Sequence, residues 1–250
     1  MTPERHKMED KIFKIKENSQ AARDVYHLRL EGDSSEINCP GQFASIKLDG
    51  LFLRRPFSIC SWDESGLDIY YKAVGEGTAK LSILPVGTEL SVLTGLGKGY
   101  DSAPSGDNPL LIGGGMGATP LYCLCRKLIA EGKRPTVLLG FASDKDIFLS
   151  DEFKTLGADV IICTDDGSCG HKGFVTDVMA GLDYSYFYTC GPEGMFRAID
   201  RIAKTEGQFS FEARMGCGFG ACMGCTCKTH KGNKRICKDG PVLERSEIIW

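Results

Sequence analysis

The chain has 250 residues, of which 42% are hydrophobic and 25% are charged. This composition is typical of globular proteins, and the length exceeds that of most single domains, so we expect two domains. The formal net charge of −3 does not favour nucleic acid or an anionic membrane surface as a partner. Residues 1–16 are charged and polar, without the apolar core of a signal peptide, and no stretch approaches the ~20 apolar residues needed to span a bilayer. We therefore expect a cytoplasmic protein with no membrane segment.

The first hundred residues have the pattern of short β-strands separated by turns. Residues 11–16 largely alternate between polar and apolar side chains, as half-buried strands do. Gly, Pro and Asp residues mark the turns between such segments. This pattern predicts a small antiparallel β-barrel. The candidate strands are 11–16, 25–30, 43–48, 67–73 and 89–93.

The pattern changes after residues 101–108 (DSAPSGDN), which are almost entirely turn-forming types and mark a domain boundary. From Pro109 onward, short apolar runs alternate with helical patterns. This alternation predicts a parallel sheet with helices on its faces. The candidate strands are 110–113, 136–141, 159–163 and 186–189, and the candidate helices are 119–131, 150–156, 174–179 and 194–205.

Twelve cysteines occur in the chain, and five of them fall within residues 217–237. Four of these have the spacing C-x4-C-x2-C-x11-C, which opens with the plant-type ferredoxin spacing for a [2Fe–2S] cluster. Intervening glycines allow the backbone to wrap closely and to direct N–H groups at the sulfurs. Zinc and disulfides are the alternatives, although zinc prefers paired cysteine knuckles and a reducing compartment disfavours disulfides. The predicted cluster ligands are Cys217, Cys222, Cys225 and Cys237, and spacing does not exclude Cys227.

A different motif, RRPFSI at residues 54–59, ends a predicted strand, and GEGT at residues 75–78 opens a predicted helix. An arginine can hold a pyrophosphate in bidentate geometry, and N–H groups at a helix N-terminus can face the same phosphates. Arg-x-aromatic-Ser followed by Gly-x-Gly-Thr resembles the ferredoxin–NADP reductase superfamily, which implies FAD. Surface charges and an ordinary turn are the alternative, as is strand packing for Tyr71. The residues implied for FAD are Arg55, Pro56, Phe57, Ser58, Tyr70, Tyr71, Lys72, Gly77 and Thr78.

Two glycine-containing segments follow later strands. Residues 113–120 (GGGMGATP) lead into a helix, and small residues there allow a dinucleotide to approach the backbone. Residues 190–195 (CGPEGM) resemble the signature of the same superfamily that approaches the nicotinamide, although Cys190 has a buried strand-end thiol as its alternative. The residues implied for NAD are Gly113, Gly114, Gly117, Thr119, Cys190, Gly191, Pro192 and Met195.

Two polar residues in later loops allow further expectations. Asp144 can accept a hydrogen bond from a ribose hydroxyl, which favours NAD over NADP, or it is a solvated loop charge. The polar loop at 164–173 borders the expected nucleotide pocket by its position. Its His171 is expected to be a hydrogen-bonding loop residue, because hydride transfer between nicotinamide and flavin needs no protein acid or base.

These motifs together describe an electron relay. NAD exchanges hydride, an iron–sulfur cluster exchanges single electrons, and a flavin converts between the two. No nucleophile or acid–base pair stands out in the sequence, so no catalytic residue is expected beside the redox groups.

The order of the motifs resembles the electron-transfer subunits of type B dihydroorotate dehydrogenases over nearly the whole chain. The resemblance implies an FAD-binding β-barrel at 1–103, an NAD-binding α/β domain at 104–212 and a [2Fe–2S] segment at 213–250. It also implies a hetero-oligomer with an FMN-containing catalytic subunit that oxidises dihydroorotate in pyrimidine biosynthesis. A reductase subunit that serves another enzyme, such as an NAD(P)H:ferredoxin system, and a zinc-binding or nucleotide-sensing scaffold are the alternatives.

Overall fold

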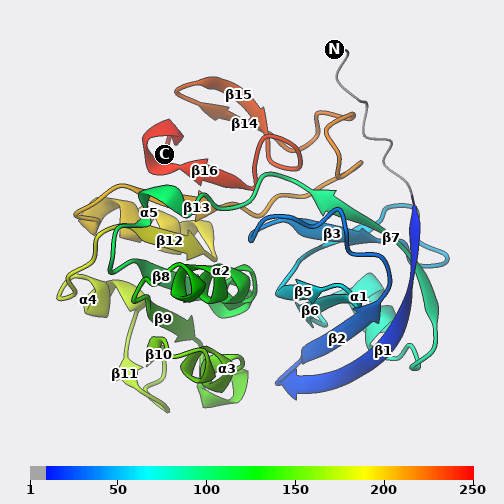
Figure 1. Ribbon diagram of the computed structural model, residues 1–250, viewed down its shortest axis with the longest axis horizontal. Coiled ribbons are helices and arrows are strands. Elements are labelled where there is room, and N and C mark those ends of the chain that lie inside the picture. Colours follow the sequence, from blue (N-terminus) through cyan, green and yellow to red (C-terminus); the bar gives the residue numbers. More distant parts are fainter. Residues whose placement is uncertain (1–9) are drawn as a thin grey trace.

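The computed structural model describes residues 10–250; residues 1–9, the first part of the charged N-terminal stretch, lie outside the described residues. Two β-sheet domains lie side by side, and a smaller segment with its own hairpin covers one end of both (Figure 1). The first sheet is antiparallel and the second is mostly parallel. The predicted fold class is therefore confirmed.

Seven antiparallel strands form the first sheet, in the order β4-β3-β7-β1-β2-β6-β5. Side chains alternate along them, as the sequence pattern requires: in β6, Ile69 and Tyr71 are buried, whereas Asp68 and Tyr70 face the other side. The strands are β1 (Lys11–Ala22), β2 (Val25–Glu31), β3 (Phe43–Ile46), β4 (Arg55–Ser58), β5 (Ser61–Asp63), β6 (Gly66–Lys72) and β7 (Glu89–Leu96). Helix α1 (Glu76–Ser82) connects β6 to β7.

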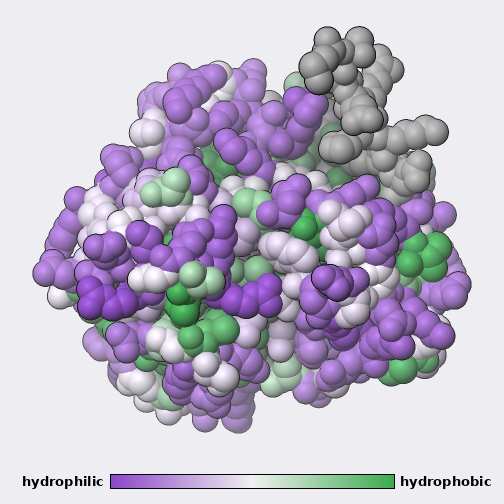
Figure 2. Space-filling model, viewed as in Figure 1, coloured by the Kyte–Doolittle hydropathy of each residue, from purple (hydrophilic) through white to green (hydrophobic). Residues whose placement is uncertain are grey.

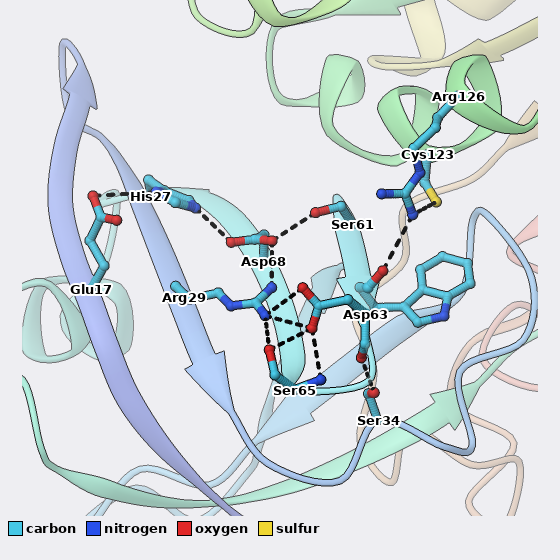
Figure 3. A network of polar contacts seen from close by, with 11 residues as sticks. Glu17, His27, Arg29, Ser34, Ser61, Asp63, Ser65, Asp68, Cys123 and Arg126 are labelled. Atoms are coloured by element: carbon cyan, nitrogen blue, oxygen red, sulfur yellow. Dashed lines mark hydrogen bonds and ion pairs between the residues drawn. The ribbon is translucent and has the colours of Figure 1, made fainter. Parts of the chain in front are cut away.

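One outer face of this barrel holds a network of charged side chains (Figure 3). Asp68 on β6 lies 2.9 Å from Nε2 of His27 and accepts a hydrogen bond from Nη1 of Arg29 at 2.8 Å. Arg29 also donates to Asp63 at 2.7 Å, and Nδ1 of His27 lies 3.5 Å from Glu17. These cross-strand pairs join β1, β2, β5 and β6 on the side away from the apolar core.

The second sheet has the order β11-β10-β9-β8-β12-β13-β16. Every neighbouring pair is parallel except the last, in which β16 runs antiparallel to β13. The sequence did not predict β16, because three residues are too few to show a period. The strands are β8 (Leu110–Gly114), β9 (Thr136–Phe141), β10 (Asp159–Thr164), β11 (His171–Lys172), β12 (Phe187–Cys190), β13 (Gly207–Ser210) and β16 (Val242–Glu244).

Helices cover both faces of this sheet, as the alternating pattern predicts (Figure 1). Successive strand residues alternate between the two faces: Leu111 packs with α2 and α3, whereas Leu110 and Ile112 pack with α4 and α5. The helices are α2 (Ala118–Ala130), α3 (Ser150–Thr155), α4 (Val175–Met179) and α5 (Glu193–Ile202). Short 3-10 turns are η1 (Ala103–Ser105), η2 (Gly115–Gly117), η3 (Asp144–Asp146) and η4 (Arg245–Glu247).

The cysteine-rich segment, residues 211–241, connects β13 to β16. Its regular structure is one hairpin, β14 (Thr226–Thr229) with β15 (Gly232–Arg235), and the rest consists of turns and bends. Figure 1 shows this segment above the ends of both sheets. The segment therefore begins and ends on neighbouring strands of the second sheet.

Side chains also cross between the two domains. Nη2 of Arg126, on α2, donates to the carbonyl of Trp62 in β5 at 3.3 Å. The ring of Tyr70, on β6, stacks on Phe148 with centroids 5.5 Å apart. The face seen in Figure 2 is mostly hydrophilic, with hydrophobic residues scattered over it. Within residues 10–250, no helix is both long and apolar enough to cross a bilayer.

Candidate functional site

The first candidate site lies where β4 approaches the start of α1. Arg55, from β4, lies against the first turn of this helix: a Cβ atom at Gly77 would be 2.6 Å from Nε of Arg55. Glycine therefore leaves the space that the guanidinium occupies. The first N–H groups of a helix have no partner within the helix and attract anions. The structure thus brings together the cation and the helix terminus that a pyrophosphate needs.

The neighbouring residues Thr78 and Arg54 have local partners. Oγ1 of Thr78 accepts hydrogen bonds from the N–H groups of Val74 (3.0 Å) and Gly75 (3.1 Å) and so caps the helix. Nη1 of Arg54 donates to the carbonyl of Ser91 at 2.9 Å. Arg54 therefore supports the strand packing, whereas Arg55 faces the helix terminus.

The aromatic residues predicted for FAD divide between two faces of the barrel. Phe57 is half-buried and contacts Tyr71 edge-on, with centroids 5.6 Å apart. Tyr71 is buried in the core, and its hydroxyl donates to Asn18 at 2.9 Å. Tyr70 lies on the opposite face, stacked between His27 and Phe148. Pro56 and Ser58 lie in β4, which pairs with β3, and are partly exposed.

The second candidate site is a cavity of about 770 Å³ at the carboxyl ends of the second sheet. Ligands of open parallel sheets bind at this edge. Most lining residues follow β8, β9, β10, β12 or β13, and Arg23, Val25 and Lys72 line it from the barrel. Four residues predicted for NAD line the cavity: Gly114, Gly191, Pro192 and Met195.

The other four residues predicted for NAD do not line the cavity; they lie behind the residues that do and shape their backbone. A Cβ atom at Gly117 would lie only 2.0 Å from the carbonyl oxygen of Cys190, so a larger residue cannot fit between these two turns. At Gly113 an added Cβ would meet the backbone of Ala118 at 3.0 Å. Thr119 is buried, and its hydroxyl is the one buried side-chain polar atom of residues 10–250 without a hydrogen-bond partner. Buried polar atoms without a partner are rare in native proteins, and this one does not line the cavity.

Cys190 is buried at the end of β12, and burial raises the pKa of its thiol. It therefore stays protonated and is no nucleophile. Glu212, which sequence analysis missed, lines the cavity just after β13. It remains open to the cavity, and desolvation by the surrounding protein raises the pKa of its carboxyl. No sequence motif identifies Glu212, because it reaches the cavity only through the order of the strands in the sheet.

The four predicted cluster ligands form two pairs in the cysteine segment. Sγ of Cys217 accepts hydrogen bonds from the N–H groups of Ala221 (3.2 Å) and Cys222 (3.4 Å), and Sγ of Cys222 accepts one from Cys217 (3.4 Å). In the second pair, Sγ of Cys225 accepts a hydrogen bond from the N–H of Cys237 at 3.4 Å. N–H groups directed at sulfur stabilise thiolate charge.

This arrangement fits a [2Fe–2S] cluster, in which each iron takes two protein sulfurs and two bridging sulfides. A single zinc ion would need three or four ligands around one point. No such group of three His, Cys, Asp or Glu side chains is found within residues 10–250. Cys227, on β14, is partly buried, and burial raises the pKa of its thiol.

Arg235 holds the turns of this segment together. Its Nη1 donates to the carbonyl of Gly220 at 2.8 Å, and its Nε donates to Asp239 at 3.1 Å. Gly220 has φ of +91°, which favours glycine, and an added Cβ would meet the side chain of Lys238 at 2.7 Å. Met223 has φ of +61° between two of the predicted ligands. The backbone therefore follows the cysteines closely through conformations that few residues adopt.

Two family models match the chain. The iron-sulfur cluster binding domain of dihydroorotate dehydrogenase B matches residues 212–249. The oxidoreductase NAD-binding domain matches residues 111–201. The first match covers the cysteine segment, and the second covers the glycine-rich turn and most of the parallel sheet.

Solved structures share the fold. An NADH-dependent reduced ferredoxin-NADP oxidoreductase, studied for flavin-based electron bifurcation, superposes with a TM-score of 0.86 at 27% identity and covers 95% of this chain and 90% of that chain. Phthalate dioxygenase reductase superposes with a TM-score of 0.66 at 18% identity, covering 82% of this chain and 69% of that one. The second likeness concerns the fold alone.

Curated relatives cover nearly the full length of the chain. The dihydroorotate dehydrogenase B (NAD(+)) electron transfer subunit of Shouchella clausii is 43% identical, over 94% of this chain and 96% of that protein. The subunit of the same name from Fusobacterium nucleatum is 40% identical with the same coverage. The chain therefore belongs to the family of electron transfer subunits of dihydroorotate dehydrogenase B.

Proposed function

We propose that this chain conducts electrons between NAD and a catalytic subunit that oxidises dihydroorotate to orotate, through FAD and a [2Fe–2S] cluster. The observation that supports it best is the presence of three sites in one chain: two cysteine pairs, an arginine at a helix terminus, and a cavity at the edge of a parallel sheet. The names of the relatives point to the same reaction.

In this proposal, each of the three regions binds its own redox group. We assign FAD to residues 1–103, NAD to residues 104–212 and the cluster to residues 213–250. When bound, FAD exchanges hydride with nicotinamide and single electrons with the cluster. Arg55 and the first turn of α1 would hold its pyrophosphate, and Phe57 and Ser58, on the same strand, would contact its flavin ring.

The nucleotide cavity positions the nicotinamide without taking part in proton transfer. Gly114, Gly191 and Pro192 let the dinucleotide approach the backbone, and Met195 packs against the same turn. Cys190 stays protonated behind this turn, and no side chain is needed as an acid or base for hydride transfer. The cysteines Cys217, Cys222, Cys225 and Cys237 provide the four thiolates of the cluster.

The partner in this proposal is a catalytic subunit that contains FMN, assembled with this chain as a hetero-oligomer. Cys222 is exposed, and Phe219 and Met223 beside it are exposed apolar side chains. Apolar side chains around a redox site that must pass electrons to another protein are typical of an interface.

The proposal is tested by expressing the chain with a dihydroorotate-oxidising subunit and purifying the complex without oxygen. We expect FAD, iron and acid-labile sulfide in this chain, and dihydroorotate-dependent reduction of NAD only when both subunits are present. Zinc without acid-labile sulfide, or a catalytic subunit that reduces NAD equally well alone, would contradict it.

A second candidate is a reductase subunit that exchanges electrons with ferredoxin. The 27% identity and TM-score of 0.86 to the NADH-dependent reduced ferredoxin-NADP oxidoreductase favour it. Replacing the catalytic subunit by reduced ferredoxin in the same assay separates the two candidates, because only the second predicts rapid reduction of NAD under those conditions.

A further inference from the structure

We infer that Arg23 and Asp146 are a positioning pair, which holds the barrel against the nucleotide domain at the separation that hydride transfer requires. Arg23 belongs to the barrel and Asp146 to the nucleotide domain, and both line the cavity. The inference rests on the proposed binding of FAD and NAD to these two domains. It assigns a role to two residues that no sequence motif identified.

The walls of the cavity come from both domains. Arg23, Val25 and Lys72 line it from the barrel, and Asp146 and Phe148 are among the residues that line it from the nucleotide domain. The width of the cavity between these walls therefore depends on how closely the two domains approach each other. Hydride moves between reacting atoms that are about 3–3.5 Å apart, so a small change in the domain arrangement slows it strongly.

The tip of the β1–β2 hairpin reaches the nucleotide domain (Figure 1). Arg23 and Asp24 connect the two strands, and Asp24 has a φ of +59°, which few residues other than glycine adopt. The carbonyl of Asp24 accepts a hydrogen bond from the N–H of Ala73 at 2.8 Å. The N–H of Arg23 donates to the carbonyl of Lys145, across the domain boundary, at 3.0 Å. These backbone contacts place the Arg23 side chain beside η3.

The carboxylate of Asp146, in η3, takes its partners from both domains. Its side chain is only 9% exposed. Nε of Arg23 donates to Oδ1 at 3.1 Å, and Nη2 of the same guanidinium donates to Oδ2. The hydroxyl of Ser143 donates to Oδ2 at 2.8 Å, and Nζ of Lys72 lies 3.8 Å from Oδ1. A bidentate arginine–carboxylate contact fixes both the distance and the orientation of the groups that it joins.

The ion pairs that join the two domains converge on this one carboxylate. Within residues 10–250, every ion pair between the barrel and the nucleotide domain ends on Asp146. Asp144, in the same turn, was suggested by the sequence for a ribose hydroxyl but does not line the cavity. The stacking of Tyr70 on Phe148 also crosses the boundary, but apolar contacts are not directional. Separation of the domains at η3 would leave a buried charge without its partner, which is strongly unfavourable.

The experiment separates domain placement from nucleotide binding. In the FAD-loaded chain with its catalytic subunit, anaerobic stopped-flow absorbance follows the reduction of FAD over a range of NADH concentrations. It gives a limiting rate and a half-saturating concentration. The variants are Asp146→Asn, Arg23→Gln, the two combined, and Arg23→Lys. Asp151→Asn is the matched control, because Asp151 pairs with Lys154 within α3 at 2.8 Å and does not line the cavity.

Two further measurements do not depend on NADH. Reduction of FAD by dithionite establishes that each variant holds a reducible flavin. Amide hydrogen exchange of residues 20–26 and 142–149 measures how firmly the hairpin tip is held against η3, with or without bound FAD. This second readout reports the contact between the domains directly, whatever the rate of electron transfer.

We expect Asp146→Asn and Arg23→Gln each to lower the limiting rate roughly tenfold, with the half-saturating concentration changed less than roughly twofold. The double variant should be no slower than either single variant, because both changes remove the same contact. Arg23→Lys should recover part of the rate, since lysine keeps the charge but not the bidentate geometry. Exchange in both segments should be faster in the slow variants. Dithionite reduction in all variants, and every measurement on Asp151→Asn, should match the wild type.

Two outcomes would overturn the inference. The first is an unchanged limiting rate in folded, FAD-loaded variants. The second is a raised half-saturating concentration at an unchanged limiting rate in Arg23→Gln alone, because Arg23 would then contact the nucleotide rather than hold the domains. A wild-type complex whose FAD is reduced by dithionite but not by NADH would instead overturn the proposed function itself, and the inference with it.

Discussion

The nucleotide domain and the cysteine segment are held together by different forces. In the nucleotide domain, apolar side chains on both faces of one sheet pack against four helices, so its cavity is formed by the protein alone. In the cysteine segment, turns are held by N–H groups directed at sulfur and by one arginine. The first region therefore specifies its own structure, whereas the second depends on what its cysteines bind.

Removal of one predicted cluster ligand should have the largest effect on the cysteine segment and leave the nucleotide domain intact. Cys222 is the most exposed of the four cysteines, so Cys222→Ser changes little packing. We expect loss of iron and acid-labile sulfide and loss of electron transfer to the partner, while NADH still reduces FAD in the nucleotide and barrel domains. Metal analysis and the visible spectrum measure the first effect, and anaerobic flavin reduction measures the second.

Cys227→Ser is the control for this change, because Cys227 lies on β14 and is no predicted ligand. Retention of the full iron content in Cys222→Ser, or its loss in Cys227→Ser, would contradict the ligand assignment.

A cavity created in the apolar core should weaken the nucleotide domain and leave the cysteine segment unchanged. Phe153, on α3, is fully buried and contacts Tyr122 edge-on. Phe153→Ala should lower the free energy of unfolding by about 3–5 kcal/mol, whereas the iron content of the native protein stays unchanged. Urea denaturation followed by circular dichroism measures the loss. Phe52→Ala, at a fully exposed side chain, should be nearly neutral, and equal effects of both changes would refute the packing argument.

Loss of the arginine should weaken the cysteine segment alone. In Arg235→Lys, the forked contacts to Gly220 and Asp239 cannot both form, which should loosen the turns of the cysteine segment. We expect faster loss of iron to a chelator and an unchanged KM for NADH. Lys228→Arg on β14 is the matched control, and a change in NADH binding without faster iron loss would argue against this role.

The smallest effect concerns the charged network on the barrel (Figure 3). Burial alone would lower the pKa of His27, but the hydrogen bond and charge of Asp68, with Glu17, raise it. The network therefore stabilises the fold fully at pH values below the ordinary histidine pKa of about 6.5. This contribution is lost as the pH rises through the raised pKa of His27 in the folded protein. His27→Gln should reduce the pH dependence of the unfolding free energy by less than about 1 kcal/mol. Urea titrations at a series of pH values measure it, and an unchanged slope would exclude His27 as its source.

The sequence allowed prediction of features that depend on local pattern. The candidate strand at residues 67–73 and the glycine-rich turn before α2 identified β6 and the carboxyl edge of the second sheet. Sequence could not identify features that depend on strand order. Glu212 and Phe174 line the same cavity only because β13 and β10 belong to the same sheet. For the same reason, strand alternation alone could not decide that Tyr71 is in the barrel core and Tyr70 against Phe148.

The return of the chain through β16 has an evolutionary consequence. Because β13 and β16 pair antiparallel, with Gln208 opposite Glu244, the intervening residues form in topological terms one long hairpin loop. A loop whose two ends are adjacent can be inserted or deleted without rethreading the fold. The cysteine segment is thus a portable module, and a short turn in its place would leave a reductase that serves flavin and nucleotide alone.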